Sequence, residues 1–589
     1  MPMSDVNQHA LVLDCHRAAL EAVQSLGRAG VRSDIIARDG ADGACLAYRS
    51  KYVDRKLVHN FVSDLSGCLR ALDAERHYRL VIPSTDLGLL QILRLEEKDD
   101  LRRRCVVASN SALEVALHKA ATLALAIQLG IPVPRGHKVS GSGDGPSDIG
   151  FPRVLKPIRS RVFADGAAKA LAPVIVSSVE ERDRVLERLL PYSEVIEQEY
   201  VGGIGVGIEL LFENGRMLWN FAHERIHELP LTGGASTYRR SIAVPSMALD
   251  FSVALLQALR WHGVAMVEFK RTADGRFVLM EINPRLWGSL ALSIDAGVDF
   301  PRGLLAIAEG EAVSAQPRYK LGYSTRAMPD DIVWMGVNLY ADHDQKLLLT
   351  RPRIRSFIEY LKVFIGKESW DHFTVRDPVV FKEVVQNSLS LIFQRARKVT
   401  HGLMVREKLK RQHKSLVRNH RLTRNSNLRL LFVCYGNICR SPFAAALASS
   451  LMPEVLISSA GFNPKEYRRP PAHVCAVARE FGITLDGHKS RSLKELDCQQ
   501  ADLILVMDGE NFDALMREMP QAARRATALG FFSADPHRNI EDPYDMSIEQ
   551  SRSVFARIQS AVHGLALWLD NERRTQQRSA KMRGESFHS

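Results

Sequence analysis

The sequence predicts a multidomain α/β protein, and three observations lead to this fold class. The chain has 589 residues, more than one ordinary domain holds, so three or four folded units are expected. In its first hundred residues, short apolar runs alternate with helical patterns, which is typical of a parallel sheet covered by helices. In its last third, an apolar run precedes a tight loop and a helix-forming stretch. We therefore expect separate α/β units at the two ends of the chain.

The first unit is predicted to span residues 1–110. A helix is expected at 18–30, and strands are expected at 9–14, 33–38, 78–84 and 104–109. No G-x-G-x-x-G motif follows the first strand, so a dinucleotide site is not indicated.

A second pattern begins near residue 111 and is predicted to continue to residue 310. One long helix is expected over 112–134, closed by Gly130, and strands are expected at 150–157 and 192–201. Two hairpins follow, with turns at 213–215 and 274–275. Lys156 lies on an apolar strand, and a lysine that the fold sends inward usually needs an anionic partner.

The second hairpin carries the first group of candidate functional residues. Its two strands would set Glu268 beside Glu281, and Asn283 would share a strand face with Glu281. Two carboxylates and an amide oxygen are hard ligands that suit Mg²⁺ with a triphosphate. Arg285 lies just beyond, where it could meet phosphate.

The last third of the chain centres on the loop VCYGNICRSP, residues 433–442. The run 428–433 is predicted as a strand, and 443–452 as a helix. Such a loop points backbone N–H groups at one position, which favours phosphate binding. Cys434 would lie among these amides and beside Arg440, an arrangement that favours the thiolate. Arg440 could hold two phosphate oxygens through its planar fork.

Composition and charge limit the cellular setting. No apolar run reaches the length of a transmembrane helix, and the first residues lack the form of a signal peptide. Eight cysteines in so long a chain do not indicate a disulfide framework, and a nucleophilic thiol must stay reduced. We expect a cytoplasmic enzyme.

Most of the net charge of +12 comes from one segment. Residues 395–424 contain eleven Lys and Arg residues and one acidic residue, Glu407. The segment is predicted to be an amphipathic helix or helix pair within an accessory region, 311–427. We interpret it as a solvated spacer, and weak contact with an anionic membrane surface or nucleic acid stays open. The polar tail, 573–589, is expected to be disordered.

The loop at 433–442 resembles the signature of the low-molecular-weight protein tyrosine phosphatases. Four further segments, 457–462, 488–493, 502–508 and 541–545, follow in that family's order. The resemblance implies a phosphatase domain over 428–572 with a four-stranded parallel sheet and no cofactor. It implies that Cys434 attacks phosphorus, Arg440 binds the phosphoryl group and Asp542 is the general acid. Residues with supporting roles would be Ser441 against the thiolate, Asn437 and Ser459 bracing the loop, and Tyr435 and Tyr544 beside an aryl substrate.

Residues 1–310 resemble the ATP-grasp superfamily of carboxylate-amine ligases. The resemblance implies a Rossmann-like pre-ATP-grasp unit, followed by an ATP-grasp fold that uses ATP and Mg²⁺, with Mn²⁺ as a substitute. Glu268, Glu281 and Asn283 match the metal ligands. The nucleotide contacts would be Lys119, Lys156, Gln198, Glu199, Val201 and Arg285. The segment 223–241 resembles one that closes over substrate, with Arg225 and Arg239 as carboxylate holders. The loop 158–170 has one glycine where relatives often have several, which leaves its closure open.

Together the two resemblances imply a bifunctional enzyme. One site would join a small-molecule carboxylate to an amine through an acyl phosphate, and the other would hydrolyse an aryl phosphomonoester or a phosphotyrosine protein through a phosphocysteine. Two alternatives remain open. The ATP-grasp half could only sense nucleotide and regulate the phosphatase. The C-terminal domain could be an arsenate reductase, although Cys475 and Cys498 are widely spaced for a thiol relay.

Overall fold

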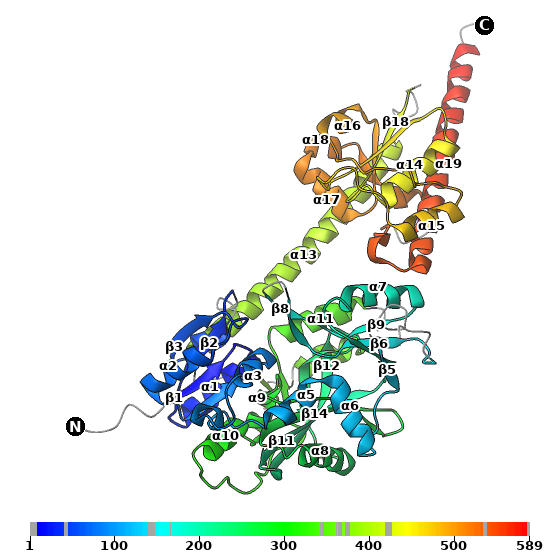
Figure 1. The fold of residues 1–589 in the computed structure, drawn as a ribbon. Helices are drawn as coiled ribbons and strands as arrows, with labels where there is room; N and C mark the ends of the chain where they lie inside the picture. The colour runs from blue at the N-terminus through cyan, green and yellow to red at the C-terminus, as the bar shows by residue number, and fades with distance from the viewer. Residues whose placement is uncertain are drawn as a thin grey trace. The chain divides into compact units, whose positions relative to one another are not determined.

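The chain divides into two compact units, Met1–Ile392 and Phe393–Ser589 (Figure 1). The structure is a computed structural model that describes residues 9–40, 45–139, 148–164, 167–341, 343, 347–360, 362, 368–371, 377–418, 427–533 and 539–585. The predicted α/β class is confirmed, because parallel sheets with flanking helices occur in both units. The boundaries predicted at residues 110, 310, 427 and 572 remain a proposal of domain organisation.

The N-terminal part forms a parallel sheet with the strand order β3-β2-β1-β4. Its strands are β1 (His9–Leu13), β2 (Arg32–Arg38), β3 (Val53–His59) and β4 (Leu80–Pro83). Its helices are α1 (Arg17–Arg28), η2 (Leu46–Arg49), α2 (Ser66–Arg76), α3 (Asp86–Ile92) and α4 (Asp100–Arg103). Strand β3 was missed by the sequence analysis because its exposed positions alternate with half-buried ones and leave no apolar run.

The strand predicted at residues 104–109 is wrong. The segment is an irregular connection, and Val106 turns it with a φ of 46°. Cys105 and Val106 are both buried, so the apolar residues that suggested a strand instead fill the core beside the sheet.

The long helix predicted over 112–134 is also corrected. The chain forms two helices, α5 (Asn110–Leu117) and α6 (Lys119–Gln128), with His118 between them. The imidazole of His118 accepts a hydrogen bond from the Ala121 N–H at 3.2 Å, so this residue caps α6. The break places Lys119 in the first turn of α6, where its side chain is buried.

An antiparallel sheet of strand order β5-β10-β6-β9 follows. Its strands are β5 (Gly136–Val139), β6 (Arg153–Pro157), β9 (Val174–Val176) and β10 (Val195–Glu199), and helix α7 (Val179–Leu189) packs on it. The segment 158–170 contains a separate ribbon of β7 (Arg161–Ala164) and β8 (Ala167–Ala170).

The largest sheet has seven strands in the order β15-β14-β11-β12-β13-β16-β17. Its strands are β11 (Ile204–Glu213), β12 (Arg216–Leu229), β13 (Ala235–Ser241), β14 (Gly263–Arg271), β15 (Phe277–Asn283), β16 (Ser324–Arg326) and β17 (Glu368–Trp370). The helices of this region are α8 (Ser246–Ala258), α9 (Leu290–Ala296), α10 (Phe300–Ala308), α11 (Asp330–Tyr340) and α12 (Arg353–Tyr360). Both predicted hairpins are present, and Asn214 and Gly215 turn the first with φ values of 49° and 85°.

The segment 223–241, expected to close over substrate, instead forms paired strands inside this sheet. It contributes the end of β12 and all of β13, which are hydrogen-bonded to each other. Strand β13 also pairs with β16 on its other side, so the segment is fixed by two ladders. Part of the region 311–427 therefore completes the sheet through β16 and β17. Residues 372–376 of that region lie outside the described part of the chain.

The C-terminal unit is a parallel four-stranded sheet of order β19-β18-β20-β21 with helices on both faces. Its strands are β18 (Arg429–Cys434), β19 (Leu456–Gly461), β20 (Leu503–Val506) and β21 (Ala526–Ala528). Its helices are α14 (Arg440–Leu451), α15 (Ala472–Glu480), α16 (Glu495–Gln500), α17 (Gly509–Glu518), α18 (Pro520–Ala523), η5 (Leu529–Phe532), η6 (Pro543–Asp545) and α19 (Ile548–Glu585).

Alternate residues of β18 point to opposite faces of this sheet. Leu430 and Phe432 join a core with α14, α15 and α19, whereas Leu431 and Val433 join a core with α16, α17 and α18. Burial on both faces explains why the strand reads as a continuous apolar run.

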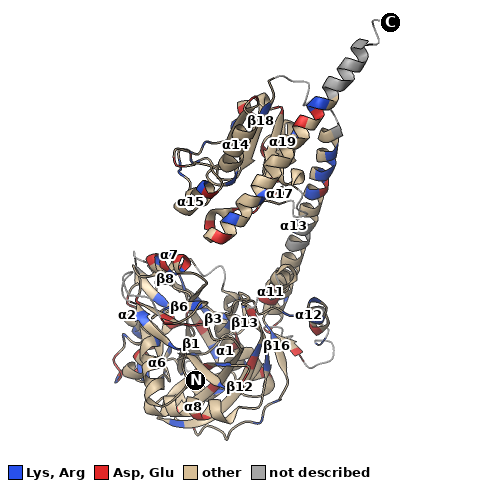
Figure 2. Cartoon of the chain, turned by 90° about the vertical axis from the view of Figure 1, so that its right-hand side faces the viewer, with Lys and Arg blue, Asp and Glu red and all other residues tan. Residues whose placement is uncertain are grey.

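The basic segment belongs to one continuous helix, α13 (Pro378–Arg418). One side of it packs on the C-terminal unit through Val405 and Leu409. Most of its described cations are exposed, and Figure 2 shows Lys and Arg along this part of the helix. Arg421 and Arg424 lie outside the described residues.

The polar tail was expected to be disordered, but α19 continues through it to Glu585. Arg573 contacts Glu454 at 2.6 Å, and Arg574 contacts Asp570 one helical turn away at 3.0 Å. Ion pairs at i,i+4 support a helix that composition alone does not predict. Residues 586–589 lie outside the described part.

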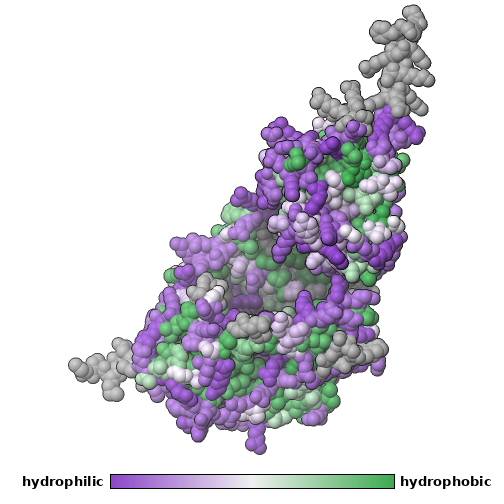
Figure 3. Space-filling view, turned by 45° about the horizontal axis from the view of Figure 1, so that its top comes forward, coloured by the Kyte–Doolittle hydropathy of each residue, from purple (hydrophilic) through white to green (hydrophobic). Residues whose placement is uncertain are grey.

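One disulfide joins Cys15 to Cys45, and the six other cysteines are free. No local pattern indicates this bridge, because the two residues are 30 positions apart and meet only when η2 packs on α1. In the described part of the chain, no helix is long and apolar enough to cross a membrane. Hydrophilic residues are spread over the surface seen in Figure 3.

Candidate active sites

The loop after β18 is held by close backbone contacts. Asn437 adopts a φ of 50°, a left-handed conformation that asparagine tolerates better than most residues. Gly461, at the end of β19, lies against this loop, and a Cβ there would come within 2.7 Å of the Tyr435 carbonyl oxygen. The loop therefore depends on a glycine in the neighbouring strand as well as on its own residues.

Cys434 lies at the base of this loop with its sulfur directed at hydrogen-bond donors. The N–H of Asn437 donates to Sγ at 3.2 Å, and the Ser441 hydroxyl lies 3.1 Å from Sγ. The residue is 2% exposed. Hydrogen bonds to sulfur stabilise a thiolate more than a thiol, so the arrangement suits a nucleophile.

Asn437 links the loop to its surroundings. Its side-chain amide donates to the hydroxyls of Ser441 and Ser459, each at 3.0 Å. Its side-chain oxygen accepts from the Arg491 N–H at 3.0 Å, and its backbone carbonyl lies 2.8 Å from His488 Nε2. These bonds fix the loop from both sides.

Arg440 begins α14 and connects the loop to two carboxylates. One Nη donates to Asp508 at 2.6 Å, and the other donates to Asp542 at 2.7 Å. Burial opposes its charge, but the Cys434 sulfur and the two carboxylates outweigh that effect and raise the pKa of Arg440. Among the described residues its buried Nε has no hydrogen-bond partner, so the guanidinium keeps a donor available for an anion.

Asp542 and two tyrosines border the entrance to this site. The Asp542 side chain is 44% exposed, which leaves it accessible to a leaving group. Tyr435 and Tyr544 are 57% and 50% exposed, so both rings lie at the surface near the loop. The structure thus brings Cys434, Arg440 and Asp542 together, although residue 542 is a hundred positions from the loop.

Asp508 also belongs to this site. It ends the segment 502–508, but no role was predicted for it from the sequence. It follows β20, and its other oxygen accepts from the Asn511 N–H at 2.7 Å, capping α17. The available signal was its place at the carboxyl end of a strand that pairs with β18, where the ends of parallel strands meet.

The predicted carboxylate pair of the first unit is present in register. Glu268 on β14 lies directly opposite Glu281 on β15. The Asn283 amide donates to Glu268 at 2.9 Å and to Glu281 at 3.3 Å, so both carboxylates converge on one atom. Burial and the charge of Glu281 raise the pKa of Glu268, although Arg225 opposes this shift.

These side chains fit a divalent cation. Two carboxylates that share one position repel each other, and a hard cation would relieve that repulsion. In the described part of the chain, no group of three or more His, Cys, Asp and Glu residues could hold a metal. The fit therefore rests on two carboxylates, the Asn283 amide and ligands from a bound substrate.

Lys156, on β6, lies within electrostatic reach of this pair. Burial lowers the pKa of Lys156, and the charge of Glu281 opposes that shift. Lys119, on α6, donates to the Ser160 hydroxyl at 2.6 Å, and its charge also lowers the pKa of Lys156. The two predicted lysines therefore lie near each other and come from separate elements.

Arg285 lies 2.6 Å from Asp86, a residue that the sequence analysis did not consider. Burial would raise the pKa of Asp86, but Arg285 outweighs it and the pKa is lowered. No local signal indicates this pair, because its members are 199 positions apart.

The two candidate carboxylate holders lie in different surroundings. Arg225 contacts Glu268 at 2.6 Å, so it reaches the carboxylate pair directly. Arg239 is wholly buried and pairs with Asp371. Breaking a buried pair by removing one partner costs roughly 3–5 kcal/mol, so substitution of Arg239 would report on folding as well as on substrate binding.

The predicted adenine-binding segment is the end of β10. Gln198 is 1% exposed, and its side-chain nitrogen has no hydrogen-bond partner in the part of the chain that the structure describes. The Glu199 N–H donates to the Arg135 carbonyl at 2.9 Å, which ties the segment to the residue before β5. Val201 follows, at the connection to β11.

Comparison with known proteins assigns both regions. A model of the low molecular weight phosphotyrosine protein phosphatase family matches residues 429–576, and a model described as ATP-grasp in the biosynthetic pathway with Ter operon matches residues 193–330. The low molecular weight protein-tyrosine-phosphatase Wzb of Escherichia coli K12 is 31% identical over 143 residues, which are 24% of this chain and 96% of Wzb.

Two further proteins are similar to parts of the chain. A protein-arginine-phosphatase of Geobacillus stearothermophilus is 33% identical over 145 residues, 24% of this chain and 97% of that protein. The crystal structure of N5-carboxyaminoimidazole synthetase from Staphylococcus aureus covers 57% of this chain and 87% of its own, with 15% identity and a TM-score of 0.45.

The chain therefore belongs to the low molecular weight phosphotyrosine protein phosphatase family through its C-terminal domain, which is fused to an ATP-grasp domain. Both resemblances inferred from the sequence are confirmed. The chain is an enzyme, with a phosphatase domain and a region that matches the ATP-grasp family.

Proposed function

We propose that the chain combines two independent catalysts, a phosphatase for aryl phosphomonoesters or phosphotyrosine proteins and a Mg-ATP-dependent carboxylate-amine ligase. The convergence of Cys434, Arg440 and Asp542 supports the first activity most strongly. The pairing of Glu268 with Glu281 supports the second.

In the phosphatase reaction, the Cys434 thiolate attacks phosphorus and the bond to the leaving oxygen breaks. Arg440 and the loop amides hold the phosphoryl oxygens during this transfer. Asp542 gives its proton to the leaving oxygen. Water then attacks the phosphocysteine, Asp542 takes the proton back, and phosphate and the thiolate are released. Tyr435 and Tyr544 would border an aryl group.

The free cysteines favour this mechanism over arsenate reduction. Cys475 joins the core on one face of the C-terminal sheet, and Cys498 joins the core on the other face. Both are buried, so neither is placed to pass electrons to its counterpart. Cys439 lies near Cys434 in sequence, but burial raises the pKa of its thiol.

In the ligase, Lys119, Lys156 and Arg285 would bind the phosphates of ATP, and the segment of Gln198, Glu199 and Val201 would bind adenine. Arg225 would hold a substrate carboxylate near the transferring phosphoryl group, and Arg239 would support that subsite. Phosphorylation of the carboxylate gives an acyl phosphate, and an amine then displaces phosphate to leave an amide. Mg²⁺ held by Glu268, Glu281 and Asn283 would offset charge on the phosphates.

Release of ADP across a panel of amino acids and other carboxylates, each with and without amines, tests the ligase. We expect at least one combination to produce ADP. Nucleotide binding without ADP release from any member would favour the sensor role.

Replacing Glu281 with glutamine tests the metal site, because it removes one anionic ligand and nearly preserves shape. We expect the Kd for Mg-ATP, measured by calorimetry, to rise at least about tenfold, or about 1.4 kcal/mol. Glu213→Gln, at the half-buried end of β11, is the matched control and should bind normally. Equal affinities of the two variants would remove Glu281 from the nucleotide site.

The setting of these reactions is also a proposal. We place the protein in the cytoplasm, since Cys434 must stay reduced, although Cys15 and Cys45 are bridged. The basic segment 395–424 would act mainly as a spacer, and the exposed cations of its described part in α13 would allow weak contact with an anionic surface.

A further inference from the structure

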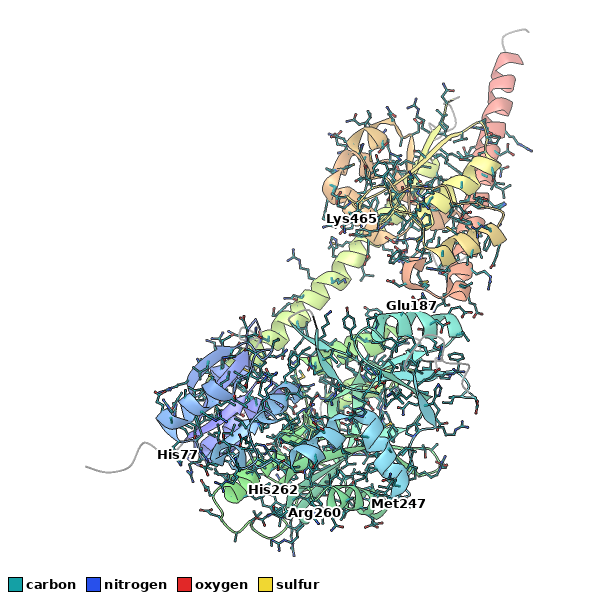
Figure 4. All side chains as sticks on the ribbon, viewed as in Figure 1. His77, Glu187, Met247, Arg260, His262 and Lys465 are labelled. Atoms are coloured by element: carbon teal, nitrogen blue, oxygen red, sulfur yellow. A yellow bond between two sulfur atoms is a disulfide. The ribbon has the colours of Figure 1, made fainter. Side chains whose placement is uncertain are left out.

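Four cations lie in two connections that contact the phosphatase loop, and the mechanism above uses none of them. Lys465, Arg468 and Arg469 lie in the connection between β19 and α15, and Lys489 lies in the connection before α16. We call these four residues the cationic rim. Lys465, labelled in Figure 4, lies at the surface of the C-terminal unit.

Hydrogen bonds tie both connections to the nucleophile loop. Arg468 Nη2 donates to the Gly436 carbonyl oxygen at 2.7 Å, two residues from Cys434. The Ser490 hydroxyl accepts from the Arg468 N–H at 3.0 Å, and the Ser490 N–H donates to the Arg468 carbonyl at 2.9 Å. His488 contacts the Asn437 carbonyl in turn. The rim is therefore fixed beside the site.

The cations of the rim have no acidic partner among the described residues. Neighbouring arginines behave differently, since Arg491 lies 2.8 Å from Asp497 and Arg479 lies 2.6 Å from Asp486. Lys465, Arg469 and Lys489 are exposed, and the Arg468 guanidinium bonds only backbone carbonyls. Unpaired like charges close together repel, so their placement is explained better by an anionic ligand than by folding.

The connections that carry the rim and the loop that carries the general acid differ in charge. The loop that carries the general acid also carries Glu541 and Asp545, both exposed. Glu466, which follows Lys465, is already hydrogen-bonded, because its side chain accepts from the Ser492 N–H at 3.1 Å. A substrate would thus meet cations on the rim and carboxylates on the acid loop.

The rim lies outside the loop that binds the phosphoryl group, so only a substrate that extends beyond its phosphate can reach it. Tyr467, which precedes Arg468, is 74% exposed and offers an aromatic surface beside the rim. A peptide can extend from the phosphoryl-binding loop to the rim, whereas a small aryl phosphate cannot. The added negative charge must then come from residues next to the phosphotyrosine.

We propose that the cationic rim selects phosphotyrosine in an acidic peptide, with Asp or Glu residues on one side of the phosphorylated residue. The proposal rests on the phosphatase activity proposed above and names the substrate class of that site. Attraction between oppositely charged surfaces acts mainly on the rate of association, so it should appear in kcat/KM.

The test compares phosphotyrosine peptides whose flanks are acidic on the N-terminal side, acidic on the C-terminal side, or neutral. We expect kcat/KM for one acidic peptide to exceed that of the neutral peptide roughly tenfold. The triple variant Lys465→Glu, Arg469→Glu and Lys489→Glu should remove this preference. It should hydrolyse p-nitrophenyl phosphate at the wild-type rate, because that substrate does not reach the rim. Arg468 is left intact because its side chain supports the loop.

Arg524→Glu is the matched control, since this exposed arginine precedes β21 at the opposite end of the parallel strands. It should keep the preference. Raising the salt concentration to about 0.5 M should weaken the preference in wild type. Equal kcat/KM for acidic and neutral peptides, or equal effects of the triple variant and Arg524→Glu, would overturn the proposal. Failure to hydrolyse any aryl phosphate would instead overturn the phosphatase activity itself.

Discussion

Replacement of Cys434 with serine is expected to abolish hydrolysis of aryl phosphates while the fold stays intact. A serine hydroxyl at its ordinary pKa is a far weaker nucleophile than a thiolate. The side chains are nearly equal in size, so the contacts with Asn437 and Ser441 can persist. Initial rates with p-nitrophenyl phosphate, together with circular dichroism, measure both parts of this expectation.

Cys498→Ser provides the control, because Cys498 is also buried in this unit but lies on α16, away from the loop. This variant should retain hydrolysis. If Cys434→Ser kept more than roughly a few per cent of the wild-type rate, Cys434 could not be the nucleophile.

The second large effect is expected for Asp542→Asn with a poor leaving group. An alkoxide or unactivated phenolate needs a proton as the P–O bond breaks, so the rate should fall roughly 10²–10⁴-fold. A nitrophenolate leaves with less assistance and should suffer a smaller loss. Phenyl phosphate and p-nitrophenyl phosphate, measured side by side, give the required comparison.

Asp545→Asn, on the same loop and exposed, controls for the loss of one negative charge near the entrance. It should affect both substrates little. Equal losses for the two leaving groups in Asp542→Asn would contradict the assignment of Asp542 as general acid.

Both proposed sites hold their charged groups in ion pairs before any substrate binds. Arg440 contacts Asp542, and Arg225 contacts Glu268. A phosphoryl group must therefore compete with a carboxylate for Arg440, and a metal must compete with Arg225 for Glu268. Such pairs compensate buried charges, which would be costly if they were left unpaired.

Features that depend on neighbouring residues could be predicted from the sequence. The phosphatase loop is formed by one strand, one turn and the start of one helix. The positions of the residues from Cys434 to Pro442 therefore depend mainly on their sequence neighbours. The hairpin of β14 and β15 likewise brings Glu268 beside the strand of Glu281, and a register shift between Glu268 and Phe269 sets the two carboxylates directly opposite each other.

Features that depend on distant residues could not be predicted. Asp86 meets Arg285 only after two sheets have packed together, and Asp508 meets Arg440 only because β20 lies beside β18. The break at His118 was hidden because the apolar pattern continues through it, although the side-chain cap stops one helix and starts another. The helical tail was missed because its composition resembles that of disordered segments.

We expect the two sites to act independently. One set of phosphatase assays tests this claim most directly. Hydrolysis of p-nitrophenyl phosphate is measured for wild type and Glu281→Gln, each with Mg-ATP, without it, and in EDTA. Since Arg440 and the loop amides bind the phosphoryl group, we expect the same rate in every condition for both proteins. A change on adding Mg-ATP to wild type that Glu281→Gln abolishes would contradict the claim and show that the ATP-grasp domain regulates the phosphatase.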